Sequence, residues 1–217
     1  MAKEPTTERG RQSRDRIVEA AADLVGQRGV DGTGIDHVLA AAGASKSQLY
    51  HYFADKDDLM RAVIARRFDQ VIVGQEPLLA ELDSWVAIRR WLDMFVDQTE
   101  ATGHHGCPIG TLANELADRD DEARADLAAC FAAWEGYLVD GLTHMRQRGD
   151  LAPKADPRQL ALAVFASLQG GLLLAKTHKD AEPLRVALDA AYAHLRTFRA
   201  AKPTARTGTS TGGHAPG

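Results

Sequence analysis

The sequence predicts an all-α protein, and three observations support that class. Ala (37) and Leu (23) far outnumber the β-branched residues Val (12) and Ile (6), which favours helices over strands. Apolar residues recur with a helical period along most of the chain. With 217 residues, 45% hydrophobic and 26% charged, the chain has enough apolar surface for one compact unit or two joined ones. An all-β fold and a disordered chain are excluded.

The first expected helix follows a polar segment, residues 1–12, which we interpret as a mobile arm. Ile17, Ala21 and Val25 share one face of a helix that we expect to begin after Ser13 as N-cap and to end at Gly29. A short second helix is expected over residues 35–42, opened by Thr33 and ended by Gly43.

The third helix is expected to be short, from Ser45 to about Tyr52. Ser45 and Gln48 have the spacing of a capping box, in which each side chain binds the backbone N–H of the other. A fourth helix begins at Asp55, carries a long apolar stripe and ends within residues 74–77. We expect it to link two parts of the protein.

Five further helices are expected in the acidic remainder of the chain. Their predicted ranges are 85–102, 108–117, 121–149, 156–178 and 182–199. The last 17 residues have no apolar face, and we interpret residues 201–217 as a disordered tail. The predicted organisation is an arm (1–12), a small helical domain (13–55), a larger helical domain (56–200) and the tail.

The second and third helices, separated by the tight turn at residues 42–44, make a helix-turn-helix pattern that can bind DNA. Leu49 and Tyr52 are expected to face inward. The outward side chains are hydrogen-bonding types, with Gln48 suited to an adenine edge and Lys46 to guanine. A plain solvated surface is the alternative interpretation.

Residues 17–64 resemble the DNA-binding domain of TetR-family repressors, through the run AGASKSQLYHYF at 42–53 followed by Lys56 and Leu59. Val38-Leu39 and Ser47-Gln48 depart from the usual family residues. The resemblance implies a cytoplasmic homodimer that binds an operator of inverted symmetry, usually as a repressor, and releases it when a small molecule binds the C-terminal domain. It implies base contacts from Ser45, Lys46, Ser47 and Gln48, and phosphate contacts from Thr33, Tyr50, His51 and Lys56.

Bulky apolar side chains follow helical spacing in the larger domain, and for each residue ordinary core packing is the alternative to a ligand role. A small-molecule pocket between these helices would be mainly aromatic with few polar groups. The candidate ligand-binding residues are Trp91, Phe95, Cys107, Leu112, Phe131, Trp134 and Phe165.

Residues 103–110 contain His104, His105 and Cys107. No second His/Cys pair follows at a suitable spacing, so we predict no metal site and no cofactor. A helix N-terminus and nearby His could lower the pKa of Cys107, which makes a thiol-based sensor of oxidants or electrophiles an alternative to a buried structural thiol. The run GCPIG, with QGGLLL at 169–174, also resembles the LmrA/YxaF branch of the TetR family.

The last two long helices are expected to pair with those of a second copy in a four-helix bundle, which the TetR resemblance implies. Gly170 and Gly171 suit close helix approach there. The candidate dimerisation residues are Leu160, Val164, Leu168, Leu172, Leu184, Leu188, Ala191 and Leu195. Packing of the same residues inside one chain is the alternative.

Other function classes find little support in the sequence. No phosphate-binding Gly-rich loop, Gly-x-Ser-x-Gly elbow or His-Glu-x-x-His motif occurs, so an enzyme is not predicted. A helical interaction protein without DNA binding remains a minor alternative. No secretory signal and no apolar run of membrane-spanning length is seen, so we expect a cytoplasmic protein without a membrane span.

Overall fold

The computed structural model describes residues 5–103 and 106–200, and α-helices dominate both ranges. This confirms the predicted all-α class. The helices are α1 (Glu8–Arg28), α2 (Ile35–Ala42), α3 (Lys46–Tyr52), α4 (Lys56–Val73), the 3-10 turn η1 (Leu78–Glu81), α5 (Trp85–Thr102), α6 (Pro108–Leu116), α7 (Asp121–Gln147), α8 (Pro157–His178) and α9 (Glu182–Arg196).

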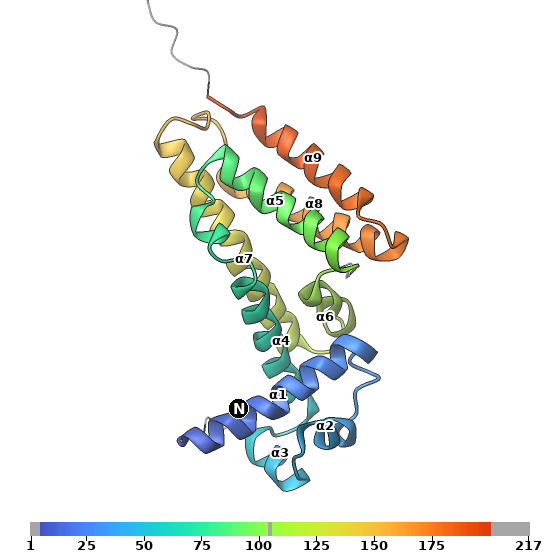
Figure 1. Ribbon diagram of the computed structural model, residues 1–217. Helices are drawn as coiled ribbons and strands as arrows, with labels where there is room; N and C mark the ends of the chain where they lie inside the picture. The colour runs from blue at the N-terminus through green and yellow to red at the C-terminus, as the bar shows by residue number, and fades with distance from the viewer. Residues whose placement is uncertain (1–4, 104–105, 201–217) are drawn as a thin grey trace, which may run out of the picture.

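Two lobes share the helix α4. The lobe of α1, α2 and α3 lies at one end of the molecule, and α4 leads from it into the larger lobe of α5 to α9 (Figure 1). Because α4 packs on α1 and also on α7, it belongs to both cores. The division expected between residues 55 and 56 therefore falls at the start of a shared helix, in which Leu59 and Val63 are buried.

The first helix begins earlier than its apolar period indicates. Thr7 is its N-cap and accepts a hydrogen bond from the Gly10 N–H, whereas Ser13 lies buried inside the helix. Glu8 binds Arg11 and Gln12 in the first turn, and such polar pairs support a helix without any apolar residue. The prediction of a mobile arm over residues 1–12 is therefore wrong for residues 8–12, while residues 1–4 lie outside the described part of the chain.

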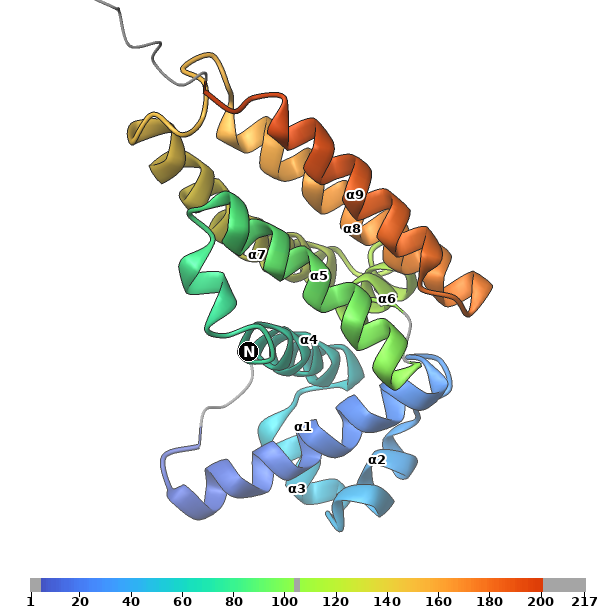
Figure 2. The same cartoon turned by 45° about the horizontal axis from the view of Figure 1, so that its top comes forward.

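The outer flank of the larger lobe is the antiparallel pair of α8 and α9, which lie side by side in both views (Figure 2). Gly171 makes the pair tight, since a Cβ there would lie 2.9 Å from Leu184 Cδ1 and 3.1 Å from its Cα. By length and composition alone α8 could cross a bilayer, with a mean hydropathy of 1.5. Its buried side chains pack on α7 and α9, as expected of a core helix.

Candidate DNA-binding and effector sites

The turn between α2 and α3 is set by a left-handed glycine. Gly43 has φ 59° and ψ 38°, and the N–H groups of Gly43 and Ala44 bind the carbonyls of Ala40 and Leu39. This is the Schellman pattern, which ends a helix and reverses the chain in two residues. The sequence predicted the turn correctly, because glycine enters this conformation without a Cβ penalty.

The helix α3 starts with the predicted capping box. Ser45 Oγ accepts from the Gln48 N–H at 3.2 Å, and Gln48 Oε1 accepts from the Ser45 N–H at 2.8 Å. Leu49 and Tyr52 are buried, as predicted. The side chains that remain exposed at the tip of the lobe are those of Ser45, Lys46, Ser47, Gln48, Tyr50 and His51.

Two residues expected to bind DNA have other partners in this structure. Thr33 is 1% exposed and its hydroxyl donates to the Gly29 carbonyl at 2.8 Å, so its side chain does not reach a phosphate, and the prediction for Thr33 is wrong. Thr33 also does not cap α2, which begins after Gly34. Lys56 is half-buried and donates to the Val30 carbonyl at 2.9 Å, which leaves two ammonium protons for another acceptor.

The segment between α1 and α2 is held by the larger lobe. Glu115 of α6 accepts a hydrogen bond from the Val30 N–H at 2.6 Å. Arg119, just after α6, binds both carboxylate oxygens of Asp31 at 2.7 and 2.8 Å, and this lowers the pKa of Asp31 and raises that of Arg119. The C-terminal end of α6 thus contacts the smaller lobe.

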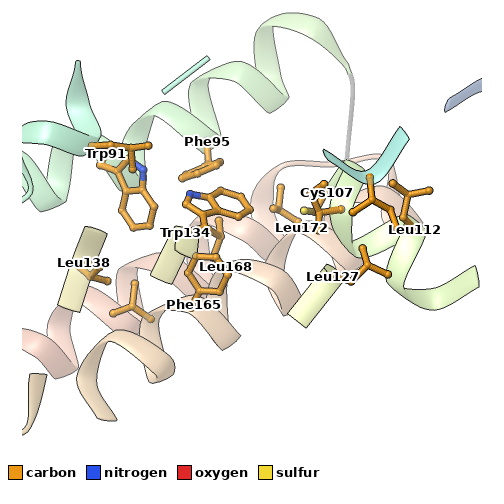
Figure 3. Packing of buried hydrophobic residues seen from close by; sticks show 14 of the residues in the cluster. Trp91, Phe95, Cys107, Leu112, Leu127, Trp134, Leu138, Phe165, Leu168 and Leu172 are labelled. Atoms are coloured by element: carbon orange, nitrogen blue, oxygen red, sulfur yellow. The ribbon is translucent and has the colours of Figure 1, made fainter. Parts of the chain in front are cut away.

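An aromatic cluster fills the middle of the larger lobe (Figure 3). The Trp134 ring lies between Phe95 and Phe165, with centroids 6.1 and 4.9 Å away. Trp91 packs edge-on against Phe95 at 5.3 Å, and Phe131 against Phe165 at 6.2 Å. These aromatic residues, predicted from helical spacing, therefore do come together.

One polar side chain inside this cluster was not predicted. Gln75, just after α4 and 4% exposed, accepts the indole N–H of Trp91 at 2.9 Å and that of Trp134 at 3.0 Å on the same Oε1. Its Nε2 donates to the Val71 carbonyl at 2.7 Å. Buried indoles need acceptors, so the sequence implied such a residue without indicating which one. Gln75 joins the end of α4 to α5 and α7.

A cavity of about 360 Å³ lies beside Gln75 and Trp134. Phe95, Cys107, Trp134 and Leu172 supply its apolar wall, and Gln75 lines it as well. The remaining lining residues are Gln70, Val71, Gly74, Gln98, Thr99, Thr102, Gly106 and Pro108. None of these side chains is charged. We call this space the aromatic cavity.

The other predicted ligand residues are distributed around it. Phe131 lines a neighbouring cavity of about 370 Å³, and Leu112 lines a third of about 390 Å³. Cys107 lines all three cavities. Trp91 and Phe165 line none of the three and pack in the core behind them, so a direct ligand contact from these two is not supported.

The Cys107 thiol is a buried helix cap. Its Sγ accepts from the Gly110 N–H at 3.3 Å at the start of α6, and the side chain is 7% exposed. Burial raises the pKa of Cys107 above its ordinary value, although the backbone N–H groups of Gly110 and Ile109 oppose the shift. The expectation of a lowered pKa is wrong. His104 and His105, invoked for it and weighed as metal ligands, lie outside the described residues.

Comparison with known proteins agrees with this arrangement. Residues 17–63 match the model of bacterial regulatory proteins of the tetR family, and residues 85–190 match the LmrA/YxaF-like C-terminal domain of transcriptional regulators. The chain is 30% identical over 183 residues to the uncharacterized HTH-type transcriptional regulator YxaF of Bacillus subtilis, which covers 82% of this chain and 92% of the relative. This chain belongs to the TetR family of transcriptional regulators.

Other relatives extend the likeness. The HTH-type transcriptional repressor DhaR of Mycobacterium sp. is 28% identical over 177 residues, covering 79% of this chain and 86% of the relative. A crystal structure of a TetR transcriptional regulator from Chloroflexus aurantiacus has a TM-score of 0.75 at 26% identity, covering 90% of this chain and all of that one. Both the DNA-binding lobe and the larger lobe of this TetR-family chain thus have counterparts.

The predicted dimerisation residues of this TetR-family chain fill its own core. Every one of the eight is less than a tenth exposed in the single chain, and they pack α8 and α9 on each other and on the larger lobe. The prediction that they face a partner is wrong for Leu160, Val164, Leu168, Leu172, Leu184, Leu188, Ala191 and Leu195. The apolar period correctly located the buried faces of both helices, but these faces pack inside the chain, which was the alternative interpretation.

The outer face of the same two helices carries exposed apolar side chains, most of them on α8. Leu162, Leu173 and Leu174 of α8 and Val186 of α9 are each about half exposed, with exposures of 49–58%. Small residues lie between them at helical spacing, among them Gly170, where a Cβ would meet nothing within 4 Å. We call this surface the outer face of α8 and α9.

Proposed function

We propose that this TetR-family regulator is a homodimeric repressor that binds a palindromic operator through α3 and releases it when a small effector enters the aromatic cavity. The observation that carries the proposal is the exposed polar surface of α3, on a helix fixed by its capping box and buried Leu49 and Tyr52. A helix presented in this way fits the major groove of B-DNA.

Individual contacts follow from the exposed side chains. Lys46 and Ser47 have no other partner among the described residues, so we assign base contacts to them. Gln48 Oε1 already accepts from Ser45, and base pairing would share that oxygen through its second lone pair. Tyr50, His51 and the remaining protons of Lys56 are assigned to phosphates.

Selection of duplexes from a random DNA pool by the purified protein, at two salt concentrations, tests operator binding. We expect a palindromic motif that persists at the higher salt, because base contacts survive when phosphate binding is weakened. Lys46→Ala should lose affinity, while Lys154→Ala, an equal loss of charge in the loop before α8, should not. Sequence-blind binding alone would favour the helical interaction protein over the repressor.

We propose that the outer face of α8 and α9 forms the dimer interface. Its apolar side chains and small residues suit the close packing of a four-helix bundle. Gly170→Glu should convert the dimer to monomers in sedimentation experiments. Gly136→Glu is the matched control, because Gly136 is also a helical glycine whose Cβ would meet nothing within 4 Å. A dimeric Gly170→Glu variant would place the interface elsewhere.

The proposed effector is small and mostly apolar, since aromatic rings and neutral amides line the aromatic cavity. Two helices connect this cavity to the DNA-binding lobe. Gln75 lies at the cavity end of α4, whose other end adjoins α3, and Cys107 begins α6, whose far end binds Val30 through Glu115. An effector that shifts either helix changes the separation of the two α3 helices in the dimer.

Coupling of this kind is reciprocal, so effector and operator weaken each other's binding by the same free energy, typically about 1–3 kcal/mol. Trp134→Ala should lower effector affinity in a folded variant.

A thiol-based sensor is less well supported, because burial raises the pKa of Cys107 and so makes the reactive thiolate scarce at neutral pH.

A further inference from the structure

The third cavity, of about 390 Å³, lies where the two lobes meet. On the side of the DNA-binding lobe it is lined by Val25 and Gly26 of α1 and by Arg67 of α4. Part of the opposite side is formed by Thr111 and Leu112 of α6. Lys176 and Lys179 at the end of α8 complete it, together with Gly103, Gly106, Cys107 and Pro108. Among the described lining residues three are cationic and none is acidic. We call this space the cationic cavity.

Two of the three cations lie close against glycines. Gly26 lies within α1, and a Cβ there would come within 3.0 Å of Arg67 Nη2, so the glycine lets the guanidinium lie on the helix. Gly106, at φ 117°, leaves room for the side chain of Lys176, whose Cδ would lie 3.0 Å from a Cβ at Gly106. A glycine inside a helix lowers its stability, which calls for a compensating role.

Lys179 is in the left-handed conformation at φ 58°, and it is the one non-glycine residue with positive φ in the described chain. A lysine is strained there, whereas glycine is the usual residue at such a helix end. A basic side chain near a helix C-terminus complements the helix dipole. That explanation does not extend to Arg67, which belongs to another helix on the opposite wall.

The positive charge in this cavity is poorly compensated within the chain. Lys176 binds only the Thr111 hydroxyl, at 3.4 Å, and Lys179 has no ion pair within residues 5–103 and 106–200. Arg67 donates to the Ala22 carbonyl and to Gln70, and its contact with Asp23 is long, at 3.5 Å. Cations gathered in one cavity repel one another, and a bound anion offsets that repulsion.

We propose that the cationic cavity binds a small organic anion, with its carboxylate held by Arg67, Lys176 and Lys179 and its apolar body against Val25, Pro108 and Leu112. An arginine fork and two ammonium groups match carboxylate oxygens, and the apolar wall selects against a bare inorganic ion. This site is distinct from the aromatic cavity, with which it shares the wall formed by Gly106, Cys107 and Pro108.

The bound anion would touch α1 and α4 on one side and α6 and α8 on the other. Its binding would therefore be linked to operator affinity, a consequence that depends on the proposed function, whereas binding itself does not. The two are separated by measuring anion binding on the protein without DNA. Operator binding by a protein that takes no anion would refute the cavity proposal and leave the repressor proposal intact.

Calorimetric titration with octanoate, octan-1-ol and octylamine tests the site, since these probes share an apolar body and differ in the head group. We expect saturable octanoate binding at least tenfold tighter than that of either other probe. Lys176→Gln should weaken octanoate binding at least fivefold, and the distant Lys154→Gln should leave it unchanged. Equal binding of octanoate and octan-1-ol, or an unaffected Lys176→Gln variant, would overturn the proposal.

Lys179→Gly gives a second, sharper test. The substitution removes a charge but relieves the left-handed backbone, so the melting temperature of the free protein should rise while octanoate affinity falls at least fivefold. If the variant lost octanoate affinity because its fold was damaged, its melting temperature would fall rather than rise. Undiminished octanoate affinity in the more stable variant would show that Lys179 plays no part in anion binding and would refute its place in the site.

Discussion

The two hydrogen bonds that Gln75 accepts support a quantitative prediction for Gln75→Met. This substitution keeps the length of the side chain and removes its amide. Both indole N–H groups, of Trp91 and Trp134, lose their acceptor at once. A buried donor left without a partner costs about 1–3 kcal/mol, so two cost about 2–6 kcal/mol. Because Gln75 lines a cavity that is roomy enough for water, we expect the lower end, about 2–3 kcal/mol.

Urea denaturation at one fixed protein concentration measures this effect, since the stability of a dimer depends on concentration. Gln98→Met is the matched control. Gln98 lines the same cavity but is exposed, so its replacement should change the free energy of unfolding by less than about 0.5 kcal/mol. If Gln75→Met also costs less than about 0.5 kcal/mol, the two indoles do not depend on Gln75, and its role as the link between α4 and the aromatic cluster is refuted.

Three further predictions concern DNA binding and the thiol. Gln48→Glu retains the capping box but loses the amide donor. The helix content measured by circular dichroism should stay unchanged, while the base preference found in a repeated selection should weaken. An unchanged base preference would show that Gln48 does not contact bases. Lys56→Ala should weaken binding to all sequences and flatten the salt dependence in anisotropy titrations, and a loss confined to the operator would contradict a phosphate contact. Alkylation of Cys107 by iodoacetamide should be slow at pH 7 and accelerate only above pH 9, the ordinary thiol pKa, because burial raises the pKa of Cys107. Rapid reaction at pH 7 would support a thiol-based sensor instead.

The sequence predicted well the elements that are marked by local signals. Residues 85–102 were expected as a helix and α5 has those bounds, because Ser84 caps its first turn and the left-handed Gly103 ends it. The capping box and the turn glycine made the helix-turn-helix equally clear. The start of α1 was missed because Thr7 and the polar pairs after it carry no apolar period.

Features that depend on packing between distant segments were predicted less well. The period of α8 and α9 identified their apolar faces, and the TetR resemblance assigned those faces to the partner, whereas they pack inside the chain. Gln75 lies in what the sequence shows only as a helix end, and nothing local indicates that two tryptophans 16 and 59 residues away bind it. The cationic cavity likewise joins residues of α1, α4, α6 and α8.

The spacing of half-sites in the selected operator tests the central claim most directly. A symmetric dimer that places its two α3 helices in successive major grooves requires half-sites about one helical turn apart, roughly 10 base pairs. Insertion of five base pairs between them turns one half-site to the opposite side of the duplex. We predict that this insertion reduces affinity to the level of random DNA; undiminished affinity would show that the two α3 helices do not bind together as a dimer.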